Sequence, residues 1–186
     1  MTTNNYDYST QFRNAIRTAI QPWVEWTHIS MGKTHCPTCL KLDKCWFVKA
    51  NMPILPQHEY CHCTAVPKLA RTVQAQAKAT SPIKKFTEYL FNQNNPKNGG
   101  KTELFELWGY DKTDSQWMVE ESQRQAREKY IAGDYSLGKL DEYGQRIHIQ
   151  MTIPDRVTGE VKIFRTVWMA KPDGELVLVT PYGDDK

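Results

Sequence analysis

The chain has 186 residues, a formal net charge of +3 at pH 7, and 40% hydrophobic residues. This length suits one medium domain or two small ones, and no apolar run is long enough to span a membrane. The opening residues lack the charged-then-apolar order of a signal peptide, so we expect a cytoplasmic, reducing compartment. The small charge excludes a strongly basic nucleic-acid-binding surface.

The first predicted element is an amphipathic helix that ends near Pro22. Apolar residues recur there at helical spacing, at Phe12, Ala15, Ile16, Ala19, Ile20 and Trp23. Proline does not continue a helix, which places the end of this element. We expect its apolar stripe to pack against the rest of an N-terminal unit.

A Cys/His cluster follows, and it holds all five cysteines of the chain between Cys36 and Cys63. HCPTC and HEYCHC have the spacing of zinc ligands, because a Cys-x-x-Cys turn lets two thiolates meet one tetrahedral ion. We predict a structural zinc bound by Cys36, Cys39, His58 and Cys63, with Cys61 as the first substitute.

Two other interpretations of the cluster remain open. A disulfide framework is typical of secreted chains with an even cysteine count, whereas this count is odd. Thioredoxin-like redox chemistry needs a βαβ context, and the flanking residues do not supply one. The spacing therefore favours structural zinc, in a site whose ligand set can close without an open position.

The sequence predicts a second unit after a polar, Ala/Gln-rich stretch. We assign residues 1–72 to a small helical zinc-binding module, 73–81 to a linker and 82–186 to an α+β domain. Ser81 and Pro82 begin a helix, Lys101–Trp108 forms another that stops at Gly109, and Asp114 caps a longer one that runs to Gly133.

After Gly144 the hydrophobic period changes to two, which predicts strands at 146–153, 161–170 and 176–180. The expected architecture is helices packed on a three- to four-stranded antiparallel sheet. A turn centred on Val157 would place His148 near Thr166. Arg165 would then lie on a different, apolar face, and Thr180 would join either residue, depending on the turn at Asp173-Gly174.

The Cys/His segment resembles a known module. CPTCLKLDKCWF followed by MPILPQHEYCHCTAVP is similar to the C-terminal metal motif of phage Mu F-type head morphogenesis proteins. The resemblance covers about residues 27–67. Lys44 stands where that motif usually has glycine, and Cys45 is extra. The resemblance implies a phage or prophage setting, with a phage head protein as one candidate partner.

The second unit resembles the barnase–EndoU–colicin–RelE (BECR) superfamily of metal-independent toxin ribonucleases. The segments that carry the resemblance, in order, are KKFTEYLFNQNNPKNGGKTELFELWGY, YGQRIHIQMTI, FRTVWM and LVLVTPY. It implies a hydrolase-type toxin that cleaves RNA, with tRNA as one candidate substrate and an immunity protein as a candidate partner. It also matches Lys101 to a lysine of the family.

Four residues are the candidate catalytic set. His148 is the one histidine of this unit, and its ordinary pKa suits proton transfer. Lys101 and Arg165 are cations for a phosphate, and Thr180 is an orienting hydroxyl. Each also has a plainer interpretation. His148 fits a surface residue of a strand, and Lys101 fits a solvated side chain. Arg165 fits a buried side chain with an acidic partner, and Thr180 fits the β-propensity of threonine alone. Lys97, Trp168 and Tyr182 are lesser candidates.

The sequence thus supports two functions of different class. The first is an RNA-cleaving toxin in the cytoplasm of a bacterial host, with zinc in a structural role only. The second is a non-enzymatic phage structural or adaptor protein, associated with the virion head and stabilised by zinc. A zinc-ribbon-like nucleic-acid-binding protein is a third reading, which the low charge disfavours.

Overall fold

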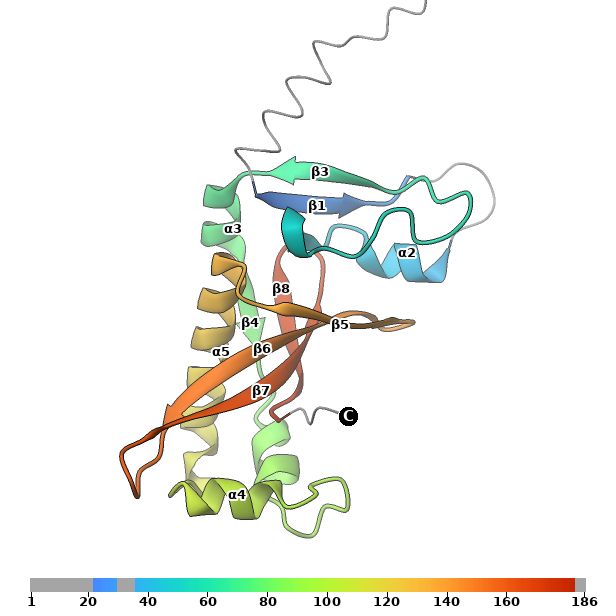
Figure 1. Cartoon of the computed structure of the whole chain (residues 1–186). Helices are drawn as coiled ribbons and strands as arrows, with labels where there is room; N and C mark the ends of the chain where they lie inside the picture. The colour runs from blue at the N-terminus through green and yellow to red at the C-terminus, as the bar shows by residue number, and fades with distance from the viewer. Residues whose placement is uncertain (1–21, 30–35, 183–186) are drawn as a thin grey trace, which may run out of the picture.

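The computed structural model describes residues 22–29 and 36–182, which form two β-sheets and several helices (Figure 1). The smaller sheet has the strand order β2-β1-β3, and the larger has the order β4-β8-β7-β6-β5. Helix α5 runs along the larger sheet, and the smaller sheet lies across one end of it. The α+β class predicted from the sequence is confirmed.

The N-terminal part is a sheet with one short helix. Strand β1 (Trp23–Thr27) pairs with β2 (Trp46–Val48) and β3 (Thr64–Lys68), both antiparallel. Helix α2 (Pro37–Leu42) starts with proline at its first position, where the missing N–H costs nothing. The predicted helix over 12–23 lies outside the described residues, except for Pro22, which is not helical, and Trp23, which begins β1 instead. A helical module is therefore not what the described residues form.

The stretch predicted as a linker, 73–81, is folded into the molecule. Helix α3 (Ala70–Gln76) ends there, and β4 (Lys78–Thr80) follows and pairs parallel with β8. Val73 and Ala77 are buried although their neighbours are polar. A composition rich in Ala and Gln allows helix as well as linker, and tertiary contacts favour the helix here.

The helices after β4 carry some of the caps that the sequence predicted, but Ser81 is not one of them: its hydroxyl lies 3.0 Å from the Ser122 hydroxyl, and the helical segment begins after Lys84. A π-helical segment, η2 (Lys85–Leu90), precedes α4 (Lys101–Leu107), whose N-cap Gly100 has a left-handed φ of 82°. The short turn η3 (Lys112–Asp114) leads into α5 (Ser115–Ala132), which ends at the left-handed Gly133. Asp114 is the N-cap of α5, as predicted, but its carboxylate accepts from Asp111 N–H, 2.9 Å away.

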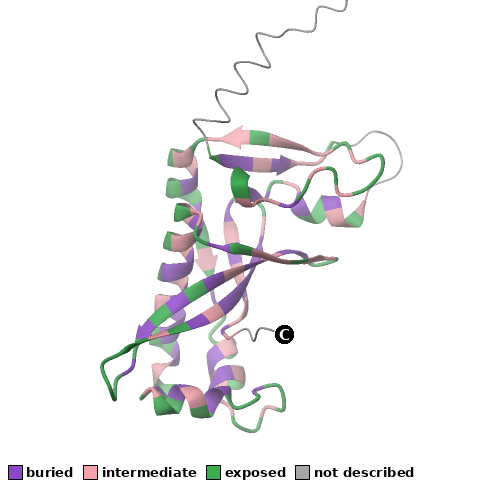
Figure 2. Cartoon of the chain, in the orientation of Figure 1, coloured by how far each residue is buried: buried purple, intermediate pink, exposed green. Residues whose placement is uncertain are grey.

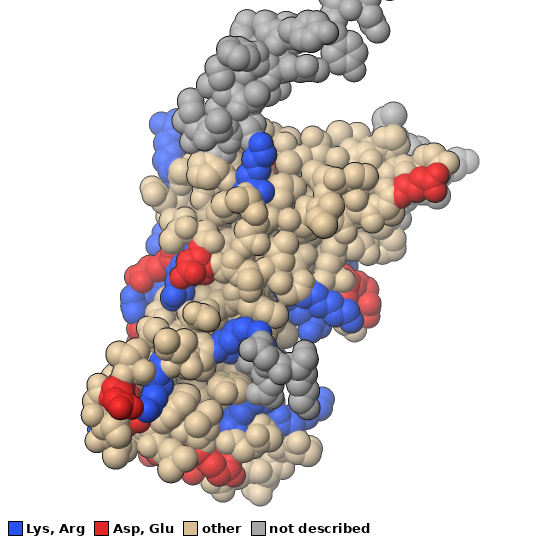
Figure 3. Space-filling view, in the orientation of Figure 1, with Lys and Arg blue, Asp and Glu red and all other residues tan. Residues whose placement is uncertain are grey.

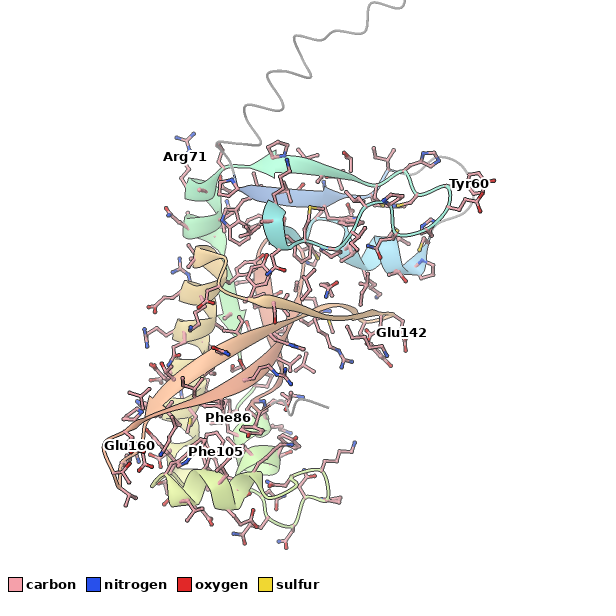
Figure 4. All side chains as sticks on the ribbon, in the orientation of Figure 1. Tyr60, Arg71, Phe86, Phe105, Glu142 and Glu160 are labelled. Carbon is pink, nitrogen blue, oxygen red and sulfur yellow. The ribbon has the colours of Figure 1, made fainter. Side chains whose placement is uncertain are left out.

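The larger sheet contains the three predicted strands and two more. The predicted ones are β6 (Gly144–Pro154), β7 (Val161–Ala170) and β8 (Glu175–Thr180); the additional ones are β4 and β5 (Ser136–Asp141). The sheet has five strands rather than three or four, and one pairing is parallel. One face is buried under the helices (Figure 2). Figure 4 labels two of the aromatic residues that fill this space, Phe86 and Phe105.

One hydrophobic core joins the smaller sheet to the larger one. Trp46 of β2 is fully buried, and its backbone carbonyl accepts a hydrogen bond from Tyr130 of α5 at 2.6 Å. A Cβ at Gly174, beside β8, would stand 2.5 Å from the Trp46 ring. Cys45 forms a β-bridge with Pro172. These contacts cross the predicted boundary between residues 72 and 82.

Candidate functional site

The register of β6 against β7 brings His148 and Arg165 to one face of the sheet. His148 lies opposite Val167, and Gln150 lies opposite Arg165. Directly opposed residues of antiparallel strands share a face. The predicted pairing of His148 with Thr166 is wrong by one residue, because the loop over 155–160 is not centred on Val157. A one-residue shift exchanges the two faces of a strand.

The loop that sets this register is held by the Asp155 carboxylate. It accepts hydrogen bonds from the N–H groups of Val157 and Thr158, at 2.8 and 2.9 Å. The Arg165 face is therefore the outer face of the sheet, on which Ile163 is 64% exposed. The opposite face carries the core residues of β7, Phe164, Thr166 and Trp168. Trp168 is fully buried there, so its role is packing.

A β-bulge between β7 and β8 adds Thr180 to the outer face. Trp168 lies opposite Leu178, but the next pair is Val167 with Thr180, so β8 contains one extra residue. Without this bulge Thr180 would face the core. His148, Val167 and Thr180 thus stand in a row across three strands. The Thr180 hydroxyl donates to the carbonyl of Tyr182 at 2.9 Å.

His148 is enclosed by the β5–β6 hairpin. Burial lowers the pKa of its imidazole, and the positive charges of Arg165 and Arg146 lower the pKa further. Arg146 also forms an ion pair with Asp141, at 3.0 Å. A lowered pKa keeps the imidazole neutral at physiological pH, which is the form that accepts a proton.

Gly138 of β5 makes room for this ring. A Cβ at Gly138 would stand 2.5 Å from His148 Nε2, and the strand is irregular between Leu137 and Leu140. The Gln145 side chain fixes the close approach by donating to the Gly138 carbonyl at 2.9 Å. No signal in the sequence marked this glycine as part of the site.

We expect Gly138→Ala to push the imidazole away from β5 and toward solvent. Because burial is the main cause of the lowered pKa of His148, greater hydration should raise that pKa toward its ordinary value. A pH titration of the His148 ring resonances by NMR measures the change. Lys139→Ala, at the exposed neighbouring position, is the control. An unchanged titration in the Gly138 variant would show that the ring is not confined by β5.

Lys101 lies at the far end of β8 from the Cys/His cluster. Its side chain is 8% exposed, its Nζ donates to the Tyr89 hydroxyl at 2.9 Å, and it lies 5.8 Å from the centre of the Tyr182 ring. Tyr182 is two residues past Thr180, so Lys101 and Thr180 are linked through it.

The π-helical segment adds a second lysine to this end. Lys85 donates to the carbonyl of Val179 at 2.7 Å, and Tyr89, four residues on, meets Lys101. Figure 3 shows Lys and Arg side chains on the face in view, between the level of β5 and that of α4. The sequence singled out Lys101 and Tyr182 but not Lys85 or Tyr89, whose spacing is equally typical of a solvated helix face.

The Cys/His residues gather in one pocket at the opposite end of the molecule, near the labelled Tyr60 of Figure 4. Ligand atoms of two triads, Cys36/Cys39/His58 and Cys39/Cys61/Cys63, lie within 4.8 Å of one another. Cys39 Sγ is 3.3 Å from His58 Nε2 and 3.8 Å from Cys61 Sγ. The five predicted ligands are therefore brought together, and they can hold a metal ion.

The chemistry of these donors fits a soft or borderline metal. Although burial raises the pKa of Cys61, hydrogen bonds from the backbone of Gln57 and of Cys63 lower it to about 7, which favours the thiolate. All the described cysteines are free of disulfides. Cys45 is fully buried outside the pocket, and its thiol lies 3.6 Å from the Ala170 carbonyl.

His28 is a pocket residue that sequence reasoning missed. It lines the cavity, and its Nδ1 lies 3.5 Å from Cys63 Sγ. The β1–β3 register pairs Thr27 with Thr64, and its continuation sets His28 opposite Cys63. A single histidine eight residues before Cys36 carries no spacing signal.

Comparison with known proteins gives one family. A sequence model of DUF6883, a domain of unknown function, matches residues 72–185. No curated protein and no solved structure matches the chain. Among the described residues, no helix has the length and apolar character that a membrane crossing requires.

Proposed function

The chain belongs to the DUF6883 family, and since the function of that family is unknown, we propose from the residues themselves that this is an RNA-cleaving toxin domain. The observation that carries the proposal is the alignment of His148 and Thr180 on the outer face of the sheet, with Arg165 on the same face. Cleavage next to a ribose 2′-OH needs a proton acceptor and a cation for the phosphorane charge, and a hydroxyl can orient the phosphate.

In the proposed mechanism the ribose 2′-OH attacks the adjacent phosphorus and the 5′-oxygen leaves. Neutral His148 accepts the proton of the 2′-OH, and its lowered pKa keeps it ready for that step. Arg165 binds the phosphorane charge, and Thr180 orients a phosphate oxygen. Lys101, held by Tyr89, binds a neighbouring phosphate. The departing 5′-oxygen takes up a proton from solvent water, and His148 then returns its proton to solvent, so the products are a 2′,3′-cyclic phosphate and a 5′-hydroxyl.

The proposal excludes a two-metal nuclease mechanism. Such a site needs clustered carboxylates. Over 22–29 and 36–182, the metal-donor groups consist of cysteine and histidine only, and they lie in the N-terminal pocket. We therefore assign a structural role to the metal, with zinc as the ion, because thiolate and imidazole donors gathered in one pocket suit zinc.

The purified protein should cleave single-stranded RNA in the presence of EDTA and leave 2′,3′-cyclic phosphate ends. DNA should survive, because it lacks the nucleophile. Product ends are identified by mass spectrometry, with a DNA oligonucleotide of the same sequence as the control. Products that end in a 3′-hydroxyl, or cleavage of both nucleic acids, would contradict the mechanism.

One observation favours the adaptor function as a second candidate. Large apolar side chains in and next to the metal pocket remain in solvent: Tyr60 and Ile29 line the pocket and are 82% and 42% exposed, and Leu40, which follows Cys39 in the chain, is 46% exposed. Such a rim is typical of a protein-binding surface. Expression in bacteria separates the two: a toxin should arrest growth, with relief by Arg165→Ala, whereas an adaptor should leave growth unchanged.

A further inference from the structure

The metal pocket contains more donors than one tetrahedral ion takes. Seven Cys and His side chains line it: His28, Cys36, Cys39, His58, Cys61, His62 and Cys63. A structural zinc uses four ligands. The cavity measures about 90 Å³, whereas a single water needs only about 10–15 Å³ on the same measure. The pocket thus has both the donors and the room for a second ion.

The donors fall into two groups that share one sulfur. Cys36 and His58 accompany Cys39 in the first triad, and Cys61 and Cys63 accompany it in the second. In a tetrahedral site with zinc–sulfur bonds of about 2.3 Å, two sulfurs are about 3.8 Å apart. Cys39 and Cys61 are separated by that distance, 3.8 Å. Cys39 is also the fully buried member, at the centre of the cluster.

His28 completes the second group. Its Nδ1 lies 3.5 Å from Cys63 Sγ, a spacing that one ion bound between them would give. Its backbone is held in place, because its N–H donates to the Asp43 carboxylate at 2.9 Å. With His28, the second group has four donors, which is a closed zinc ligand set.

We propose that the pocket binds two zinc ions bridged by the Cys39 thiolate. One ion is held by Cys36, Cys39 and His58, and the other by Cys39, Cys61, Cys63 and His28. This inference rests on the structural zinc assigned above and is independent of the ribonuclease activity.

Native mass spectrometry of the full chain, loaded with excess zinc and then desalted, should find two zinc ions per chain. Saturation at one zinc would overturn the two-ion proposal and leave the structural zinc site standing. Binding of no zinc would overturn both. Because this readout counts ions and not turnover, it separates the failure of this inference from the failure of the proposed enzyme.

Cobalt(II) tests the bridge itself. Cobalt–thiolate absorption should grow up to two equivalents. The electron paramagnetic resonance signal of high-spin cobalt should rise to one equivalent and fall toward two, because spins joined by a shared thiolate couple antiferromagnetically. A signal that doubles at the second equivalent would mean separate ions, and would overturn the bridge.

Variants locate each ion. His28→Ala and Cys36→Ser should each lower the zinc content from two ions to one. His28→Ala should lose the ion of the second group, and Cys36→Ser should lose the ion of the first. His62→Ala is the matched histidine control, since His62 lines the same cavity but belongs to neither group. Cys45→Ser is the cysteine control, outside the pocket. Both controls should keep two ions, and two ions in His28→Ala would remove His28 from the ligand set.

Discussion

Replacing Arg165 by alanine is expected to lower the rate of RNA cleavage by roughly two to three orders of magnitude, with Lys101→Ala behaving similarly. Loss of one group that stabilises transition-state charge costs about 2.7–4 kcal/mol. The effect should fall on turnover, because the charge on the phosphorane develops only in the transition state. Single-turnover cleavage of a labelled oligonucleotide by each variant measures it.

Controls separate this effect from a loss of folding. Lys84→Ala removes a lysine that is paired with Glu88, and Arg124→Ala removes an arginine that is paired with Glu121 and Glu128. Both cations lie at the surface, where ion pairs contribute little, so both variants should keep full activity. Tyr89→Phe removes only the hydrogen bond that holds Lys101, so its loss should be smaller than that of Lys101→Ala. Thermal melts check the fold. Full activity in the Lys101/Arg165 double variant would refute the assignment and favour the adaptor.

Trp46→Ala should destabilise the whole protein by about 3–5 kcal/mol, the usual cost of truncating a large buried aromatic side chain. Trp46 lies in the smaller sheet, but its ring is packed against Gly174 beside β8, and its carbonyl accepts from Tyr130 of α5. Because these contacts join the two sheets, we expect one cooperative unfolding transition that shifts as a unit. Urea denaturation followed by circular dichroism and by tryptophan fluorescence measures it.

The matched control is Trp117→Ala. Trp117 is 36% exposed and stacks on Tyr110 at the far end of α5, with ring centres 5.4 Å apart. Its loss should cost about 0.5–1.5 kcal/mol beyond the apolar area that it buries, well below the cost at Trp46. Two separate transitions, of which Trp46→Ala shifts only one, would show two independent units and would restore the boundary predicted between 72 and 82.

Local patterns in the sequence were sufficient for most elements of the larger domain. Alternating apolar residues predicted β6, β7 and β8, and Gly109 and Gly133 marked the ends of α4 and α5. These signals are local, because strand alternation and helix caps depend on neighbours within a few residues. The thiol and imidazole spacing likewise predicted five of the residues that gather in the metal pocket.

The membership of the candidate active site was decided by tertiary structure. The Asp155 loop set the β6–β7 register, and the bulge opposite Val167 turned Thr180 outward. Each is a shift of one residue, which leaves the hydrophobic pattern of a strand almost unchanged but exchanges its faces. Such a shift depends on loop hydrogen bonds and packing, which periodicity does not report.

Contacts between segments that are distant in the chain could not be predicted from local sequence patterns either. β4 pairs with β8 across about a hundred residues, and Trp46 packs against Gly174 at a similar separation. His28 meets Cys63 only because β1 and β3 are neighbours in a sheet. The sequence by itself determined most elements of the larger domain and the donor chemistry of the metal pocket. The tertiary structure decided which residues share a face, a core or a metal, because those depend on long-range pairing that no local pattern encodes.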